Sequence, residues 1–596
     1  MKNLYALFYE QVEYVPHKFA ITYNERSITY LQLACGVDSI SNRLLEMGIV
    51  PNDRVIIYMP NSIDTVKAML AVHKVGALVL PLDSSLPETR VQKIFHDSQA
   101  TVIICGSDEI AASLDALTFV IPTYYVDPDS VAPTTTLSNF LDNELAFCIY
   151  TSGSEGKPKG VLLPHETVYN QIEGKKQLLG LTTQSVLCQS LSIGFVASIW
   201  QIYGSLIIGA HLVIYPDSII KNPLLFFEKV NRDGIQVVSL VPQLLHSYCL
   251  LVEGRHKQLD LKHLQYVILT GEKLNGDVVR SFYRLYRIPI INAYGQSECS
   301  DDTFYFKVPF DFADIHVPIG SPTLGVSPFL VDEYLGLLEG PGIGELCIGG
   351  PCLSKGYLND ETLTSQKFIV HEVLNMRVFR TGDYVKRTDE GLYIYLGRLD
   401  NQIKLRGYRI SLEEVEYHVQ QYKKIRKASA ATIEMDGNTK EIVAFYISDE
   451  LVNYTDIRRF LLKELAPYAV PSRFIQVDDF IYTSSGKRDR KRMVEQFAAS
   501  SANICDSIKS DVLDEQVIQI IKSTVPAELT KDLTKDTAFE DLSISSIDFI
   551  QIVVACESTF NITFEETMIS YALFTRVTDL IAYIKERVEV AAFIRE

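Results

Sequence analysis

Along the first 300 residues, short apolar segments alternate with amphipathic stretches. The stretch Ser62–Lys74 has the spacing of a helix with one buried face. Segments that are apolar at nearly every position predict strands buried on both sides, as in parallel sheets. These segments are Val55–Ile57, Leu78–Leu82, Thr101–Ile104, Ala146–Tyr150 and Val237–Leu240. The alternation predicts an α/β domain of stacked βαβ sheets.

The pattern changes near residue 326. From Val326 to Ile348, short strands alternate with Gly/Pro turns, which predicts a β-barrel portion. Past residue 398, the helical segment EEVEYHVQQY and a few strands predict a small α+β unit. The small polar residues Ala498–Asp511 predict a linker. The amphipathic segments that follow, Val512–Val525 and Val577–Val588 among them, predict an all-α four-helix bundle.

With 596 residues, the chain exceeds the roughly 250 to 300 at which one core stops growing. We therefore predict a core domain at 1–398, a small unit at 399–497, a linker at 498–511 and a helical bundle at 512–590. The net charge of -18 argues against nucleic-acid binding, which needs basic surface. The start has no signal-peptide pattern, and polar residues interrupt the stretch Gln177–Pro216, so we expect a cytoplasmic protein without membrane contact.

The ten cysteines include no C-x-x-C pair, which predicts reduced thiols and no zinc site. The sharpest chemical signal is the segment Tyr150–Gly160, YTSGSEGKPKG, directly after an apolar run. Its glycines let successive N–H groups point inward as an anion nest, and its hydroxyls and lysines add donors for phosphate oxygens. The segment lacks the P-loop pattern. It predicts a phosphate-binding loop, and a plain surface turn is the alternative.

Further motifs follow this loop in order. They are Asn292–Glu298 (NAYGQSE), Gly344–Phe368, Phe379–Val385 (FRTGDYV), Gly397–Glu416 (GRLDNQIKLRGYRISLEEVE) and Ser484–Met493 (SSGKRDRKRM). Together with the loop they resemble the superfamily of acyl-CoA synthetases, nonribosomal-peptide adenylation domains and luciferases, over about residues 8 to 495. The resemblance implies an adenylate-forming ligase that uses ATP and Mg²⁺, with residues 399–497 acting as a lid.

The resemblance also implies roles for single residues. Glu298 would hold Mg²⁺ together with Thr151 or Ser152. Lys487 would bring an ammonium to the acyl carboxylate and the α-phosphate, where negative charge accumulates. His165 would lie near the acyl carboxylate, and a core histidine is the alternative. The nucleotide would be bound by Thr151, Ser152, Gly153, Ser154, Gly156, Lys159, Asn292, Tyr294, Gly295, Asp383 and Arg398.

Two half-reactions need different surroundings. Adenylation needs Lys487 inside the site, whereas thioester formation needs a channel for a thiol arm. The resemblance implies that the lid swings about a hinge at Asp400 and that Gly407 lines the channel, where a side chain would block the arm.

The segment Leu542–Phe549, LSISSIDF, resembles the carrier-protein signature at the start of its second helix. Ser546 would then bear 4'-phosphopantetheine, attached by a phosphopantetheinyl transferase. Two residues depart from the signature: Ser543 replaces a glycine and Ser545 replaces an aspartate. Ser546 as a helix N-cap is the alternative. The whole chain thus resembles a nonribosomal peptide synthetase adenylation domain fused to a peptidyl carrier domain.

The resemblance places the acyl pocket at Val196, Ala197, Trp200, Ser239, Ile268, Thr270, Ala293, Asp301 and Asp302. Domains selecting α-amino acids carry an aspartate where this chain has Val196, so a buried α-ammonium would lie unpaired here. Asp301 and Asp302 suit an amine further from the carboxyl, which predicts a β-amino acid such as β-alanine. Solvated loop acids are the alternative, and we expect at least one of the two to face solvent, because adjacent buried carboxylates repel.

Other functions remain open from the sequence. These are activation of an α-keto, hydroxy or simple acyl acid, a free acyl-CoA ligase, luciferase chemistry and a silent acyl-binding protein. No condensation or thioesterase motif occurs, so a downstream condensation or other acyl-accepting enzyme must act in nonribosomal peptide or related secondary-metabolite (antibiotic) biosynthesis. We expect a monomer.

The motif SSGKRDR predicts that Lys487→Ala slows adenylate formation by about 100- to 1,000-fold and leaves ATP binding largely intact. ATP–pyrophosphate exchange measures the first effect. Transfer of a preformed acyl adenylate to the carrier should suffer much less. Exchange near the wild-type rate would refute the role of Lys487.

The carrier signature predicts that Ser546→Ala abolishes the mass gained on incubation with coenzyme A and a phosphopantetheinyl transferase, and leaves adenylation intact. Intact-protein mass spectrometry checks the first effect and pyrophosphate exchange the second. A retained mass gain, mapped to Ser545 or elsewhere, would show that another residue carries the arm.

Overall fold

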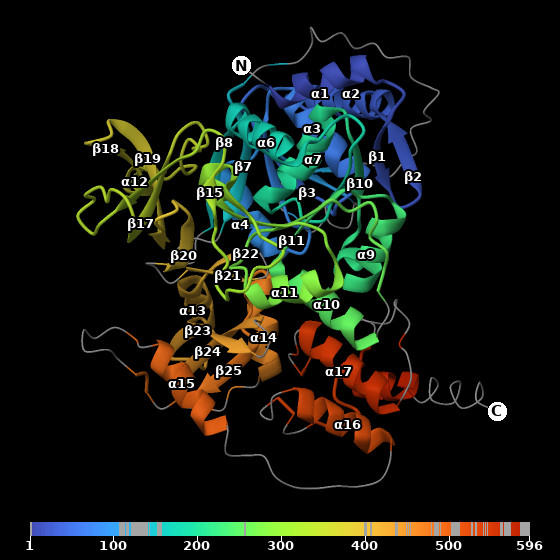
Figure 1. Ribbon diagram of the computed structural model, residues 1–596, viewed down its shortest axis with the longest axis vertical. Helices are drawn as coiled ribbons and strands as arrows, with labels where there is room; N and C mark the ends of the chain where they lie inside the picture. The colour runs from blue at the N-terminus through green and yellow to red at the C-terminus, as the bar shows by residue number, and fades with distance from the viewer. Residues whose placement is uncertain are drawn as a thin grey trace, which may run out of the picture.

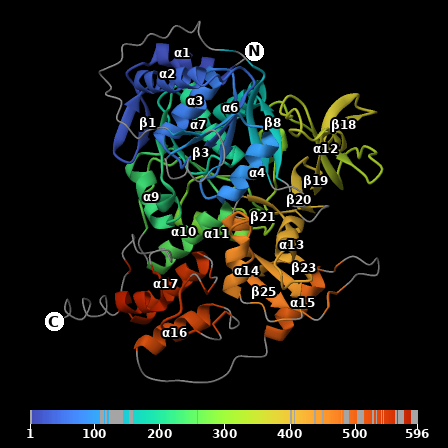
Figure 2. The same cartoon turned by 180° about the vertical axis from the view of Figure 1, so that it is seen from behind.

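A computed structural model describes residues 3–106, 114, 118–120, 141, 143–151, 158–255, 258–398, 402–405, 408–435, 439–448, 450, 452, 454–477, 479–481, 488, 490–501, 513–525, 529–530, 533–539, 541–542, 544, 546–560, 564 and 574–584. The N-terminal part consists of two large sheets with helices between and around them, and the lid and the carrier helices lie together at one end (Figure 1; Figure 2, from behind).

One sheet has six strands in the described residues, in the order β6 (Thr118–Val120), β5 (Val102–Cys105), β3 (Arg54–Tyr58), β4 (Leu78–Leu82), β7 (Leu145–Thr151) and β8 (Lys159–Pro164). Its strands are parallel except for the hairpin β7–β8. The predicted α/β architecture is confirmed here. Every residue of β4 is buried, which is why this strand reads as a continuous apolar run.

The second sheet has nine strands in the described residues. Their order is β15 (Ser321–Pro322), β14 (Asp301–Lys307), β13 (Ile290–Gln296), β12 (Tyr266–Leu269), β11 (Val237–Leu240), β9 (Val186–Gln189), β10 (His211–Ile214), β1 (Phe19–Tyr23) and β2 (Arg26–Thr29). The strands from β13 to β1 pair in parallel, and β14 and β15 continue the sheet antiparallel. The carboxyl end of β13 leads directly into the segment that carries Glu298.

The helices of the N-terminal part are α1 (Leu4–Tyr14), α2 (Tyr30–Glu46), α3 (Ile63–Lys74), α4 (Glu88–Ser98), α6 (His165–Leu179), α7 (Val196–Ile208), α8 (Asp217–Ile220), α9 (Pro223–Arg232), α10 (Pro242–Arg255), α11 (Gly276–Leu285) and α12 (Glu361–Lys367). Local signals set their ends. The Ser62 hydroxyl accepts the N–H of Thr65 and begins α3, whereas Gly180 and Gly209 end α6 and α7 in the left-handed conformation.

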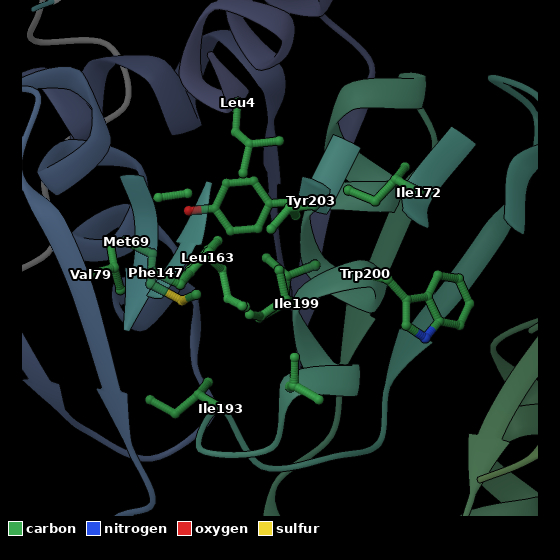
Figure 3. Close-up of a cluster of buried hydrophobic side chains, with 14 of the residues drawn as sticks. Leu4, Met69, Val79, Phe147, Leu163, Ile172, Ile193, Ile199, Trp200 and Tyr203 are labelled. Atoms are coloured by element: carbon green, nitrogen blue, oxygen red, sulfur yellow. The ribbon is translucent and has the colours of Figure 1, made fainter. Parts of the chain in front are cut away.

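The largest core joins the two sheets through α1, α3, α6 and α7. Tyr203 of α7 lies at its centre, between Leu4 of α1 and side chains of the six-stranded sheet, Phe147 among them (Figure 3). The Tyr203 hydroxyl lies 2.9 Å from Nδ1 of His73, so this buried polar group is paired. The core therefore fixes one sheet against the other, and the cavity described below opens at their common edge.

The portion predicted as a β-barrel forms a five-stranded sheet in the described chain: β16 (Ser327–Val331), β17 (Gly342–Gly349), β18 (Phe368–His371), β19 (Met376–Arg387) and β20 (Tyr393–Arg398). The lid contains the hairpin β21 (Gln402–Leu405) and β22 (Tyr408–Ser411), the strands β23 (Lys427–Met435), β24 (Thr439–Ile447) and β25 (Arg473–Gln476), and the helices α13 (Leu412–Gln420), α14 (Tyr454–Leu461) and α15 (Arg490–Ser501). The small α+β lid is thus confirmed.

The C-terminal part is helical where it is described, with α16 (Leu513–Thr524), α17 (Ser546–Phe560) and a helix over residues 577–584. Helix α17 packs against α10 of the core domain, and both views place the two side by side (Figures 1 and 2). Helix α15 runs to Ser501, into the range predicted as linker; residues 502–512 lie outside the described chain. Within the described residues, no helix is long and apolar enough to span a membrane.

Candidate active site

A cavity that is open to solvent lies between the core domain and the lid. The core contributes the carboxyl ends of strands and the turns that follow them, the usual place for ligands in open α/β sheets. The core residues that line it include Asp83, Thr151, Val196, Ala197, Thr270, Gly295, Ser297, Asp301 and Asp302, and the lid residues include Lys404, Tyr408, Arg409 and Tyr468.

The phosphate loop joins the two strands of the β7–β8 hairpin, in which Thr151 and Lys159 form the last pair. Ser152, Gly153, Ser154 and Gly156 lie outside the described residues. The Thr151 hydroxyl is buried at the cavity wall and has no hydrogen-bond partner in the described chain. A buried hydroxyl without a partner is costly, so this atom is suited to a phosphate oxygen or a metal ion.

Glu298 is fully buried in the 3₁₀ turn η3 (Ser297–Cys299), directly after β13. Its Oε1 accepts hydrogen bonds from the Tyr357 hydroxyl at 2.8 Å and from Arg409 at 2.9 Å, and Lys159 Nζ lies 3.4 Å away. Burial alone would raise the pKa of this carboxyl, but Arg409 and Lys159 hold it well below its usual range. Glu298 is therefore an ionised buried carboxylate.

The same network acts on Lys159. Burial and the neighbouring Arg409 lower its pKa to about 8, although Glu298 opposes the shift. Lys159 thus stays charged at neutral pH and lies beside the phosphate loop, where a cation can contact a phosphate.

The donor chemistry around Glu298 fits Mg²⁺. Mg²⁺ takes oxygen ligands and is often bound by one or two carboxylates plus substrate phosphates. Glu298 would supply a carboxylate ligand, and the buried Thr151 hydroxyl on the cavity wall would supply another oxygen.

The residues predicted to hold the adenosine form a second network. The Tyr294 hydroxyl donates to Oδ2 of buried Asp383, and Arg398 donates to its Oδ1 at 2.7 Å. Asp383 and Arg398 are partners across β19 and β20. Asn292 donates to the Pro318 carbonyl at 2.8 Å. These residues lie beside the cavity wall rather than on it, whereas Gly295, next to Tyr294, lies on the wall.

The lid hairpin β21–β22 brings in residues that the sequence reasoning missed. Lys404 and Arg409 are partners across the hairpin and share a face, which points into the cavity. Lys404 donates to the Gly295 carbonyl at 2.8 Å, and Arg409 binds Glu298. The alternation of Ile403, Lys404 and Leu405 was the available signal, since it predicts a strand with one polar face.

Other lid residues fix the hairpin against the core. The Tyr408 hydroxyl donates to Asp83 at 2.9 Å, and its ring stacks on that of Tyr468 with centroids 3.6 Å apart. Arg90 of α4 forms a 2.8 Å ion pair with Glu414 of α13, and both side chains are nearly buried. A buried ion pair costs several kcal/mol when one partner is removed, so these contacts specify this position of the lid.

Lys487, Asp400 and Gly407 lie outside the described residues. The neighbours of Lys487 are described: Arg490 binds Glu416 of α13 at 2.8 Å, and Arg488 donates to the Ala428 carbonyl of β23. Ser546 is the first residue of α17, and its side chain is outside the description.

The predicted acyl pocket is divided by the structure. Val196, Ala197, Thr270, Asp301 and Asp302 line the cavity, whereas Trp200, Ser239, Ile268 and Ala293 are buried behind its wall.

The expectation that Asp301 or Asp302 faces solvent is wrong. Both are buried, at 3% and 2% exposure. The physical reason is Lys175 of α6, a fully buried residue that the sequence reasoning missed. Its ammonium binds Asp301 and lies 3.3 Å from Asp302, which offsets the repulsion between the carboxylates.

His165 is buried in the core and does not line the cavity, as expected for the alternative of a core histidine. Its Nδ1 accepts the N–H of Leu4 at 3.2 Å, and its Nε2 lies 3.0 Å from the Asn143 side-chain oxygen. Burial lowers its pKa to about 4, so the ring is neutral. The reason is geometric: β8 rises about 3.3 Å per residue and carries the chain about 20 Å from the phosphate loop.

Two known protein families match separate parts of the chain. Residues 8–358 match the family described as AMP-binding enzyme, and residues 515–584 match the phosphopantetheine attachment site. The chain is 30% identical over 561 residues to gramicidin S synthase 1 of Brevibacillus brevis, covering 94% of the chain and 50% of that protein. It is 31% identical over 503 residues to gramicidin S synthase 2 of the same organism, covering 83% of the chain and 11% of that protein.

The chain therefore spans from about a tenth to a half of the length of these relatives. Among solved structures, holo-PA1221, a nonribosomal peptide synthetase protein containing adenylation and PCP domains, has a TM-score of 0.79 at 22% identity, covering 98% of this chain and 97% of that one. The adenylation domain AlmE of Vibrio cholerae has a TM-score of 0.71 at 22% identity, covering 84% of this chain and 98% of that one. These structures share the fold.

His165→Ala should lower the free energy of unfolding by about 2 to 4 kcal/mol, because it opens a cavity and leaves buried polar groups unpaired. Its catalytic effect should be small, with pyrophosphate exchange within about twofold of wild type. The folded pKa of about 4 lies below the unfolded value of about 6.5. Wild type should therefore lose this contribution as pH falls from about 6.5 to 4, and the variant should not.

Denaturant unfolding at several pH values, with exchange kinetics below the unfolding range, measures both properties of the variant. Glu298→Gln serves as the active-site reference and should lose exchange activity, because it removes the ionised carboxylate that contacts Lys159 and Arg409. Loss of exchange in His165→Ala with unchanged stability would contradict the core assignment.

Proposed function

The chain belongs to the AMP-binding enzyme family and carries a phosphopantetheine attachment domain, and from this premise we propose that it activates a β-amino acid, such as β-alanine, and loads it onto its own carrier. Membership of this family makes the chain an adenylate-forming ligase that uses ATP. The acid is joined to AMP with release of diphosphate, and the acyl group then passes to the thiol of a phosphopantetheine on Ser546.

One observation carries the choice of substrate. Val196, at the first turn of α7, and the buried pair Asp301 and Asp302 all line the same cavity. A substrate ammonium beside Val196 would be buried without a counter-charge, which costs several kcal/mol. An ammonium beside the two carboxylates would be paired. This arrangement favours an acid whose amine is further from the carboxyl than in an α-amino acid.

The adenylation step draws on groups of the phosphate side of the cavity. Lys159 supplies a cation beside the phosphate loop, and Thr151 supplies an unpaired hydroxyl. Glu298 and Thr151 would hold Mg²⁺, which neutralises the diphosphate as it leaves. Lys487 would contact the acyl carboxylate and the α-phosphate, where charge develops as the new P–O bond forms. Asp383 and Arg398 would receive the ribose, exchanging their present hydrogen bonds for those of its hydroxyls.

The observed lid position supports the second half-reaction. The hairpin β21–β22 faces the cavity, while Arg488 and Arg490, which follow Lys487 in the sequence, bind other parts of the lid. For adenylation, the lid would turn about Asp400 to bring Lys487 inward, which breaks the contact of Arg409 with Glu298. Gly407, between β21 and β22 in the sequence, would then belong to the thiol channel only in the position seen here.

The carrier decides between this function and that of a free acyl-CoA ligase. A tethered arm makes free coenzyme A unnecessary as acceptor, and the phosphopantetheine attachment domain favours the tethered route. A phosphopantetheinyl transferase would attach the arm, and a downstream condensation or other acyl-accepting enzyme would take the product in nonribosomal peptide or related biosynthesis.

We propose that the chain acts in the cytoplasm as a monomer. Activation of an α-keto, hydroxy or simple acyl acid is the second candidate, favoured by the apolar side chain of Val196.

Asp302→Asn should reduce kcat/KM for β-alanine by about 30- to 5,000-fold, equivalent to about 2 to 5 kcal/mol, because the substrate ammonium loses its counter-charge. The uncharged isostere butyrate should change by less than about threefold and serves as the internal reference. ATP–pyrophosphate exchange with both acids measures the two values. The proposal fails if wild type prefers a simple acyl, hydroxy or α-keto acid and Asp302→Asn leaves the preferences as they were.

A further inference from the structure

Lys175 lies behind the wall of the acyl pocket and has no place in the proposed function so far. It projects from α6 and its side chain is 1% exposed. Its ammonium binds Oδ2 of Asp301, lies 3.3 Å from Oδ2 of Asp302, and is 5.3 Å from the centre of the Trp200 ring. Asp301 and Asp302 are among the residues that line the cavity, and Lys175 is not. A substrate therefore meets the acids, with the cation on their far side.

The backbone is shaped to bring both acids to this lysine. Adjacent residues of a regular strand point to opposite faces. Here Ser300 has φ 67° and Asp301 has φ 155°, and the pairing of β13 with β14 shifts register between Tyr294 and Gly295. A side chain at Gly295 would place its Cβ 2.0 Å from the Asp301 carbonyl oxygen. Left-handed φ values at non-glycine residues are costly and persist where the surroundings enforce them, which marks this turn as built for the position of the two acids.

The charges of this cluster can be counted. Lys175 contributes one positive charge, and the two aspartates contribute two negative charges when ionised, so the ionised cluster carries one net negative charge. We propose that Lys175, Asp301 and Asp302 act together as a selectivity element whose single net negative charge admits a carboxylic acid with one distal ammonium group. This inference rests on the proposed function, because it names how that site selects its substrate.

The pKa of Asp301 in the empty pocket agrees with this net negative charge. Burial and the neighbouring Asp302 raise the pKa of Asp301 to about 7, although Lys175 opposes the shift. The cluster thus favours one further positive charge, which a proton supplies in the empty pocket and an ammonium would supply in the loaded one. Asp302 lies between Thr270, which donates to its Oδ1 at 2.6 Å, and Lys175, whose ammonium is 3.3 Å from its Oδ2.

The net charge of the cluster predicts a result that the contact of the substrate with Asp302 alone does not predict. Asp301→Asn leaves Asp302 and its oxygen in place, yet it reduces the cluster to zero net charge, so a bound ammonium would leave one positive charge uncompensated. Lys175→Met combined with Asp301→Asn removes one charge of each sign and restores the single negative charge on Asp302. Met has nearly the length of Lys, and Asn the shape of Asp, so the cavity wall keeps its volume.

The test compares wild type, Asp301→Asn and the double variant Lys175→Met/Asp301→Asn in ATP–pyrophosphate exchange, with β-alanine and butyrate each at several concentrations. The measured quantity is the ratio of kcat/KM for the two acids. We expect Asp301→Asn to lower this ratio at least about 30-fold and the double variant to recover it to within about fivefold of wild type. Because general misfolding lowers both rates together, the ratio separates a charge effect from a loss of folded protein.

The outcomes separate the two proposals. If wild type prefers β-alanine and Asp301→Asn keeps that preference, then Asp302 acts alone and the charge count is refuted. If Asp301→Asn loses the preference and the double variant does not regain it, Lys175 plays no part in selection and the inference is again refuted. If wild type prefers butyrate, the proposed function itself fails. Recovery in the double variant, in which two charged groups have been removed, supports the inference.

Discussion

The structure depends on how buried carboxylates are compensated. An ionised carboxylate taken from water into the protein costs several kcal/mol unless cations and hydrogen bonds replace its hydration. Glu298 meets this requirement with Lys159 from β8, Tyr357 from the loop before α12 and Arg409 from the lid hairpin. Three segments far apart in the sequence must therefore converge on one side chain. This convergence places the phosphate loop, the end of β13 and the lid around a single cavity.

The same constraint explains the pocket for the acid. Asp301 and Asp302 can both be buried because Lys175 approaches from α6, on the side away from the cavity. At Glu298, the two cations Lys159 and Arg409 surround one carboxylate. At the acyl pocket, two carboxylates surround one cation, so the site suits a positive group. The cluster at Glu298 and the cluster at Lys175 therefore carry opposite balances of charge.

Much of the fold could be predicted from the sequence, because strands buried on both faces have apolar residues at nearly every position. The segments Leu78–Leu82 and Val237–Leu240 coincide with β4 and β11. Long-range charge partners have no such signal. Lys175 lies ten residues after His165 in α6, about 15 Å along the helix, and its sequence gave no signal of its contact with Asp301. Lys404 and Arg409 were likewise missed, because the sequence of the lid does not indicate which core residues it contacts.

The most direct test of this account is the acid that the chain loads onto itself. The protein, converted to its phosphopantetheine form, is incubated with ATP, Mg²⁺ and equal concentrations of β-alanine, ¹³C-labelled α-alanine and fully deuterated butyrate, and its intact mass is then measured. The labels separate the three acids by mass. The account predicts that the unlabelled alanyl thioester dominates and that hydroxylamine removes it. A predominant gain of labelled α-alanyl or butyryl mass would contradict it, because a pocket with Val196 and the Lys175–Asp301–Asp302 cluster should disfavour both.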